Sequence, residues 1–120
     1  MTIHSTPTPA VTSATLLDKI THAMTRVHEV LTATDQRPEA VKARLAIASH
    51  AVNTVIAASC EAVSLRQTTS RAVIACGRQA LLAIEQAGDP DCRDRGYRLR
   101  TANAALHGAQ TTILNAGAKP

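Results

Sequence analysis

Apolar residues recur three and four positions apart through four segments of this 120-residue chain. That spacing matches the 3.6-residue period of an amphipathic helix, and no segment shows the alternation of a half-buried strand. The sequence therefore predicts an all-α fold: an antiparallel four-helix bundle with short loops and a disordered N-terminal tail. We expect the tail to span residues 1–13 and a single bundle domain to span residues 14–117.

The expected tail contains Ser, Thr and two prolines but no charged side chain. Pro7 and Pro9 prevent a regular helix, and the composition is typical of a flexible segment. Because no basic head precedes an apolar stretch, we expect no secretory signal peptide. Uncharged Ser/Thr/Pro-rich leaders also occur on bacterial type III secretion substrates, so export through such a system is a minor alternative to a cytoplasmic location.

The first helix is expected over residues 14–33, with Ser13 or Thr15 as its N-terminal cap. The residues of its apolar stripe are Leu16, Ile20, Met24, Val27 and Leu31. Pro38 is expected in the first turn of the second helix, since a first helical turn tolerates a residue without an N–H group. Asp35 is available to cap this second helix.

The second helix carries the longest apolar stripe, which alternates spacings of four and three. Its residues are Val41, Leu45, Ala48, Val52, Val55, Ser59 and Ala62. Ile47, Ile56 and Val63 widen the stripe beyond the seam of a two-helix coiled coil. This width indicates a bundle interior and an exposed Ala/Leu groove.

Residues 64–70 allow two interpretations. We expect a short turn in which Thr69 or Ser70 caps a third helix over residues 71–87, because Ser and Thr are good caps and poor helix interior. The alternative is one continuous helix of about 50 residues, roughly 75 Å long. Neither Gly nor Pro interrupts this segment.

Gly88, Asp89 and Pro90 mark the next boundary, as a left-handed stop, an N-cap and a first-turn proline in succession. A fourth helix is expected from there to about residue 116. Its apolar stripe is formed by Leu99, Ala102, Leu106, Ala109 and Ile113.

Alanine occupies 23 positions, almost as many as Leu, Ile and Val together, and the chain has no Phe. Small side chains let helix axes approach closely. They also bury little, because a Leu position filled by Ala loses roughly 2 kcal/mol of apolar burial. A core of this kind predicts that the bundle gains stability from self-association or from a protein partner.

Several chemistries are not expected from this sequence. Tyr97 is the one aromatic residue, so no base-stacking platform can form. Cys60, Cys76 and Cys92 are widely spaced, which argues against a disulfide framework or a thiolate zinc site and favours a reducing cytoplasm. Phosphate-binding and hydrolase motifs are absent, and no segment is apolar enough to span a membrane. We therefore expect no catalytic, cofactor-binding or metal-binding residues.

Histidine and acidic residues offer one weak metal pair. Asp18 and His22 are four residues apart on one face of the first helix, a spacing that metal ligands can use. No Glu is followed three residues later by His, which is the pattern of di-iron bundles. We expect these side chains to be ordinary surface residues.

The formal net charge is +4, and part of the excess is concentrated near the start of the fourth helix. Asp91 with Arg95, and Asp94 with Arg98, have the acid-first spacing of helical ion pairs. Arg93 and Arg100 remain unpaired there, on either side of Tyr97, and Arg66, Arg71 and Arg78 form a second basic stretch around the start of the expected third helix. The candidate contact residues for a partner or for phosphate are Arg66, Arg71, Arg93, Tyr97 and Arg100.

These features favour a non-enzymatic helical interaction protein, an adaptor, chaperone or regulator that forms homo-oligomers or binds a partner helix. The alternative is a basic bundle that contacts the phosphates of nucleic acid. A weaker alternative is a secreted filament subunit, suggested by a loose compositional likeness to type III pilins that rests on no motif.

Overall fold

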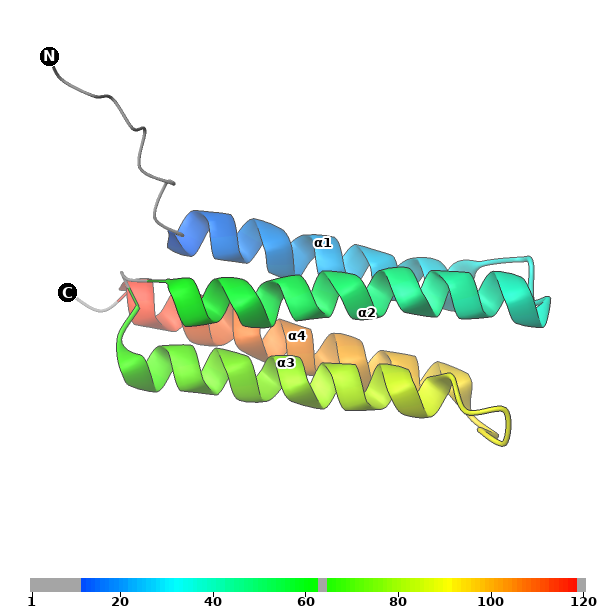
Figure 1. The fold of residues 1–120 in the computed structure, drawn as a ribbon. Coiled ribbons are helices and arrows are strands. Elements are labelled where there is room, and N and C mark those ends of the chain that lie inside the picture. Colours follow the sequence, from blue (N-terminus) through cyan, green and yellow to red (C-terminus); the bar gives the residue numbers. More distant parts are fainter. Residues whose placement is uncertain (1–11, 63–64, 119–120) are drawn as a thin grey trace, which may run out of the picture.

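The computed structural model describes residues 12–62 and 65–118. It contains four helices, drawn in Figure 1: α1 (Ser13–Thr32), α2 (Pro38–Glu61), α3 (Gln67–Ala87) and α4 (Arg95–Ala118). No strand occurs in these two ranges, so the all-α expectation is confirmed. The expected tail falls almost wholly on residues 1–11, which lie outside the described part of the chain.

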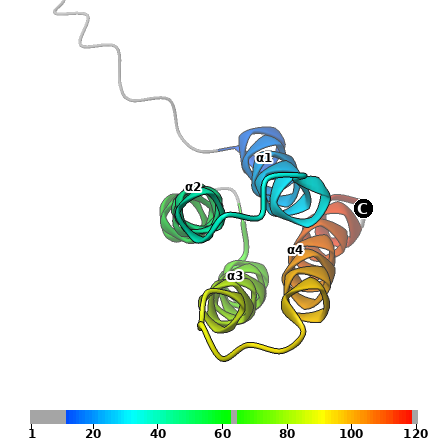
Figure 2. The same ribbon diagram turned by 90° about the vertical axis from the view of Figure 1, so that its right-hand side faces the viewer.

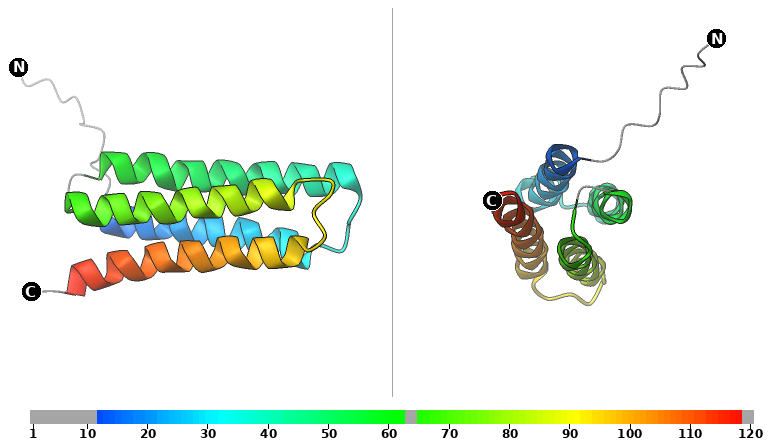
Figure 3. Two further views of the ribbon diagram at one scale, coloured as in Figure 1. Left: turned by 90° about the horizontal axis from the view of Figure 1, so that it is seen from below. Right: turned by 90° about the vertical axis from the view of Figure 1, so that its left-hand side faces the viewer.

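The four helices run along one long direction and form the corners of a square (Figures 2 and 3). α1 packs against α2 and α4, and α3 packs against the same two helices. The diagonal pairs, α1 with α3 and α2 with α4, have no Cα atoms within 8 Å of each other in the described residues. α3 and α4 are the most extensively packed neighbours. The core therefore lies along the central axis, where all four apolar stripes meet.

Alanine supplies much of this core. Within the described residues 23 hydrophobic side chains are buried, and ten of these are alanines: Ala23, Ala48, Ala51, Ala58, Ala62, Ala80, Ala83, Ala87, Ala102 and Ala109. The expected stripes of α2 and α4 are buried at every position. In α1 the prediction is partly wrong, because Ala23 and Val30 are buried while Met24 and Leu31 are half-buried at the edge.

The expected widening of the α2 stripe does not hold at Ile47. Its side chain is 53% exposed, because it faces outward beyond the α1–α2 seam. Ile56 is half-buried and packs against the core. Val63 lies outside the described residues.

The N-terminus of α1 is capped by Thr12, one residue earlier than either expected cap. Its hydroxyl oxygen accepts a hydrogen bond from the backbone N–H of Thr15 at 3.1 Å. α2 begins at Pro38, so this residue lies in the first helical turn as predicted. Asp35 does not cap it, since the Asp35 carboxylate accepts from the N–H of Arg37 instead.

The ambiguous segment contains a break, so the continuous-helix alternative is wrong. α2 ends at Glu61 and α3 begins at Gln67, four residues earlier than expected. Ser70 therefore lies inside the first turns of α3 rather than at its cap. Its hydroxyl donates to the Ser59 carbonyl at 2.7 Å and ties the start of α3 to the end of α2.

The segment after α3 is a loop over residues 88–94, longer than the sequence suggests. Gly88 has φ −81°, in the right-handed region, so the expected left-handed stop does not occur. The Asp89 carboxylate accepts from the N–H of Asp91 at 2.9 Å and forms a turn, which occupies the group expected to cap the next helix. α4 accordingly begins at Arg95, five residues after Pro90.

Candidate interaction surfaces

The candidate contact residues nominated by the sequence lie in two separate groups. Arg66 and Arg71 are exposed around the start of α3, whereas Arg93, Tyr97 and Arg100 are exposed around the start of α4. Figure 1 places these two helix starts at opposite ends of the bundle. α3 has 21 residues, which separates the groups by about 30 Å. The fold does not bring the five residues into one basic patch.

Tyr97 lies among charges of both signs. Its side chain is 55% exposed, and the Arg98 guanidinium carbon lies 5.9 Å from the ring centroid, within cation–π range. Arg93 and Tyr97 line a surface depression of about 370 Å³. Three carboxylates line the same depression, those of Asp89, Asp91 and Asp94. This end of the bundle is therefore a surface of mixed charge.

The ion pair expected between Asp91 and Arg95 does not form. Because α4 begins at Arg95, Asp91 lies in the preceding loop, and the four-residue spacing does not correspond to a helical turn. The Arg95 Nε donates instead to the carbonyl of Ala87 at 3.0 Å. It thereby occupies one of the carbonyls that the end of α3 leaves open.

The pair expected between Asp94 and Arg98 is also absent. The Asp94 Oδ1 accepts from the backbone N–H of Tyr97 at 2.8 Å, in the manner of an N-terminal cap. The Arg98 Nη1 donates to the Gln86 Oε1 at 3.0 Å, which links α4 to α3. Asp94 therefore caps α4 and Arg98 links α4 to α3, and the two charged groups do not pair with each other.

One exposed ion pair changes the pKa of its members. The Arg37 Nη2 and the Asp35 Oδ2 are 2.8 Å apart in the loop between α1 and α2. Hydrogen bonds from the Arg37 side chain, and then from its backbone N–H, lower the pKa of Asp35 below its usual value. The same contact raises the pKa of Arg37. The Arg37 side chain is 71% exposed and the Asp35 side chain 32% exposed, so solvent screens the pair and it makes little difference to stability.

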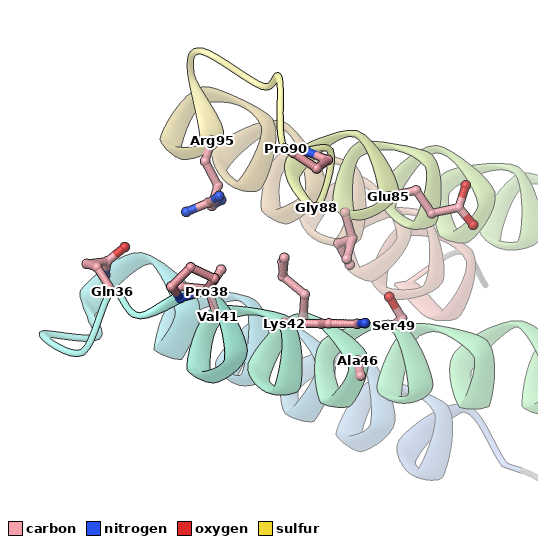
Figure 4. Close-up of a pocket in the computed structure, with 12 residues that line it drawn as sticks. Gln36, Pro38, Val41, Lys42, Ala46, Ser49, Glu85, Gly88, Pro90 and Arg95 are labelled. Atoms are coloured by element: carbon pink, nitrogen blue, oxygen red, sulfur yellow. The ribbon is translucent and has the colours of Figure 1, made fainter.

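A depression of about 560 Å³ lies between α2 and α3 and is shown in Figure 4. Val41, Leu45 and Ile84 form an apolar floor that is almost completely buried. Lys42 and Arg95 stand at the mouth. The volume suits a small ligand, and the polar side chains of Ser49 and Glu85 also line the depression.

A second depression of about 380 Å³ lies on the seam between α1 and α2. Asp18, His22 and His50 all line it. Nevertheless, no group of three or more His, Cys, Asp or Glu side chains suited to a metal ion occurs within residues 12–62 and 65–118. Cys76 does not line this depression. It lies between α3 and α4, where its Sγ is 3.7 Å from the position that a Cβ on Gly108 would occupy.

Four large hydrophobic side chains of the described residues are more than half exposed: Ile47, Leu82, Tyr97 and Leu114. Leu82 lines a groove of about 470 Å³ between α3 and α4. The other lining residues are Gln79, Ala83, Gln86, Thr101, Ala104 and Ala105, and none of the seven is charged. We call the outward surface built around this groove the α3–α4 face.

Sequence reasoning missed this face because it followed one buried stripe in each helix. A second stripe of α3 shows the same three- and four-residue spacing on the outside of the bundle. Its members are Ala72, Ala75, Gln79, Leu82 and Gln86, all exposed and none charged. An uncharged exposed stripe was the signal that could have identified the face.

None of the helices in the described residues is apolar over a length that would cross a bilayer. The groove between α3 and α4 is lined by uncharged side chains, whereas ionisable side chains within the helices line other depressions, for example Lys42 and Glu85 or Asp18 and His22. Comparison with protein-family models, with curated proteins and with solved structures gave no match to this chain.

Proposed function

We propose that this protein is a non-enzymatic interaction module, an antiparallel four-helix bundle with short connections that works as a homo-oligomer or bound to a partner helix. The antiparallel order is supported by contacts that run in opposite directions along α3 and α4. Gln86 meets Arg98 near one end, and Cys76 meets Gly108 further along. Connections of five to seven residues are typical of such bundles.

The observation that carries the proposal is the alanine content of the core. A buried leucine contributes roughly 2 kcal/mol or more beyond what a buried alanine contributes at the same position. The completely buried leucines and isoleucines are few, for example Leu16, Ile20 and Leu106. A bundle with so little apolar burial gains most from association, which covers further surface without changing the fold.

The first test is the mass of the protein in solution. Sedimentation velocity across two decades of micromolar concentration is expected to show a folded assembly larger than the monomer. The thermal midpoint, followed by circular dichroism over the same range, is expected to rise with concentration, since association stabilises the folded state by mass action. A folded monomer whose midpoint is independent of concentration would contradict the proposal.

Nucleic-acid binding is the second candidate. It is supported by Arg93 and Arg100, which form no ion pair within the described residues. Arg93 and Arg100 are separated from Arg66 and Arg71, and this separation weakens the case for nucleic-acid binding. One duplex would have to lie along the bundle to reach both groups of arginines. Binding to labelled duplex DNA and RNA should then fall steeply as salt rises. The absence of binding at low salt would remove this candidate.

A filament subunit differs from a closed oligomer in how its assembly grows. A closed symmetric dimer stops at a defined mass, whereas head-to-tail contacts give open assemblies, so the same sedimentation series separates the two.

The cytoplasmic location is supported by Cys60, Cys76 and Cys92, which are free thiols as expected in a reducing compartment.

A further inference from the structure

We infer that the α3–α4 face is the surface on which a second copy of this chain docks. The inference rests on the self-association proposed above and adds the site at which it occurs. It also accounts for Leu82, one of the four large hydrophobic side chains of the described residues that are more than half exposed.

The first argument is the lack of charge at the centre of the face. The seven groove-lining residues are uncharged, and Ala72 and Ala75 continue the exposed stripe of α3 without charge. The charged residues lie around this centre: Arg66 and Arg98 at its two ends, and exposed Arg71, Arg78 and Glu85 on α3 beside the stripe. Because the protein carries a net charge of +4, two copies repel each other least where charge is lacking. Depletion of charge at the centre with charge at the rim is the usual composition of a protein interface.

The second argument is self-complementarity. In a two-fold dimer the same patch faces itself, so each group meets the surface from which it comes. A patch of arginines would meet arginines. The amides of Gln79 and Gln86 and the hydroxyl of Thr101 each contain a donor and an acceptor, so they can pair with their own kind. The face suits a second copy without requiring a partner of opposite charge.

The third argument is size. α3 has 21 residues and α4 has 24. Two adjacent helices of about 10 Å diameter and about 30 Å length present roughly 600 Å² in projection. The accessible surface is larger than the projection, because side-chain ridges and grooves add to it. The face therefore approaches the roughly 800 Å² per partner that specific interfaces bury.

The other exposed hydrophobic side chains lie beside ionisable groups. Tyr97 lines the depression that contains three carboxylates. Ile47 is three residues before His50, which lines the α1–α2 depression together with Asp18 and Lys19. Leu114 is seven residues after His107 on one face of α4. Burying these surfaces against a second copy would also bury ionisable groups, which is costly unless they are paired.

The test compares glutamate substitutions at positions of nearly equal exposure. Leu82→Glu and Ala104→Glu place a carboxylate on the α3–α4 face, and Ile47→Glu and Leu114→Glu are the matched controls. We expect the first two to weaken self-association by about tenfold or more in sedimentation velocity, and the controls to leave it nearly unchanged. Helix content by circular dichroism should be equal in all four, since each site is exposed.

The outcomes separate the inference from the proposal beneath it. A wild-type protein that stays monomeric overturns both. If the wild type associates and Leu82→Glu and Ala104→Glu associate equally well, the α3–α4 face is not the interface. The same conclusion follows if Ile47→Glu or Leu114→Glu alone dissociates the assembly, while self-association itself stands.

Discussion

At the scale of single residues, Gly77 shows how closely two helices approach. A Cβ built there would lie 2.7 Å from Cγ1 of Ile56 in α2, closer than real side chains come. At Gly108 the nearest heavy atom to a built Cβ is the Cys76 sulfur at 3.7 Å, an ordinary contact. Neither glycine has a positive φ, so only space distinguishes the two sites. Gly77 is required by the packing of α3 on α2, and Gly108 is not.

Alanine at these two positions should have opposite effects. Gly77→Ala is expected to lower the free energy of unfolding by about 1 kcal/mol, because overpacking at Ile56 exceeds the gain in helix propensity. Gly108→Ala is expected to raise it by up to about 1 kcal/mol, since it gains propensity without a clash. Urea unfolding at one fixed protein concentration measures both. Equal shifts in the same direction would refute the packing argument.

At the scale of helices, the start of α4 depends on one carboxylate. Asp94 precedes the helix and accepts from the Tyr97 amide, while the Asp91 side chain, three residues earlier, makes no hydrogen bond in the described structure. The same loop therefore provides a capping residue and a matched control of identical chemistry.

Asp94→Ala is expected to lower the free energy of unfolding by about 1 kcal/mol, because the Tyr97 N–H loses its partner. Asp91→Ala should leave it nearly unchanged. Urea unfolding gives the two values, and amide hydrogen exchange at the first turn of α4 locates the effect. If Asp91→Ala costs as much as Asp94→Ala, capping is not what fixes this helix start.

The buried stripes of α2 and α4 were predictable from sequence because one period runs through each without competition. The α1 stripe was less predictable, since large Met24 and Leu31 compete with smaller Ala23 and Val30, and the close approach of neighbouring helices favours the small pair at the centre. Helix starts were predictable only in part. Propensity cannot show that the Ser70 hydroxyl bonds to another helix, because that contact exists only after folding.

At the scale of the whole molecule, the arrangement of the helices decides which candidate residues can act together. Arg71 lies near the start of α3, and Arg93 lies in the loop after the end of α3. Because α3 extends along the bundle, these two basic residues lie near opposite ends of it. Packing has the opposite effect at the α3–α4 face, because it brings stripes from two different helices together into one surface. Sequence patterns describe single helices, and a shared surface requires knowledge of which helices are neighbours.

The alanine-rich core also determines how stability responds to temperature. Ten of the 23 buried hydrophobic side chains are alanines, so unfolding exposes less new apolar surface to water than unfolding a leucine-rich core would, and that exposure is the source of the heat-capacity increment. The increment per residue should fall below the usual value of about 12–15 cal/mol/K. A small increment makes the curve of unfolding free energy against temperature broad and flat. We therefore expect the stability of this bundle to change little between cold and warm conditions.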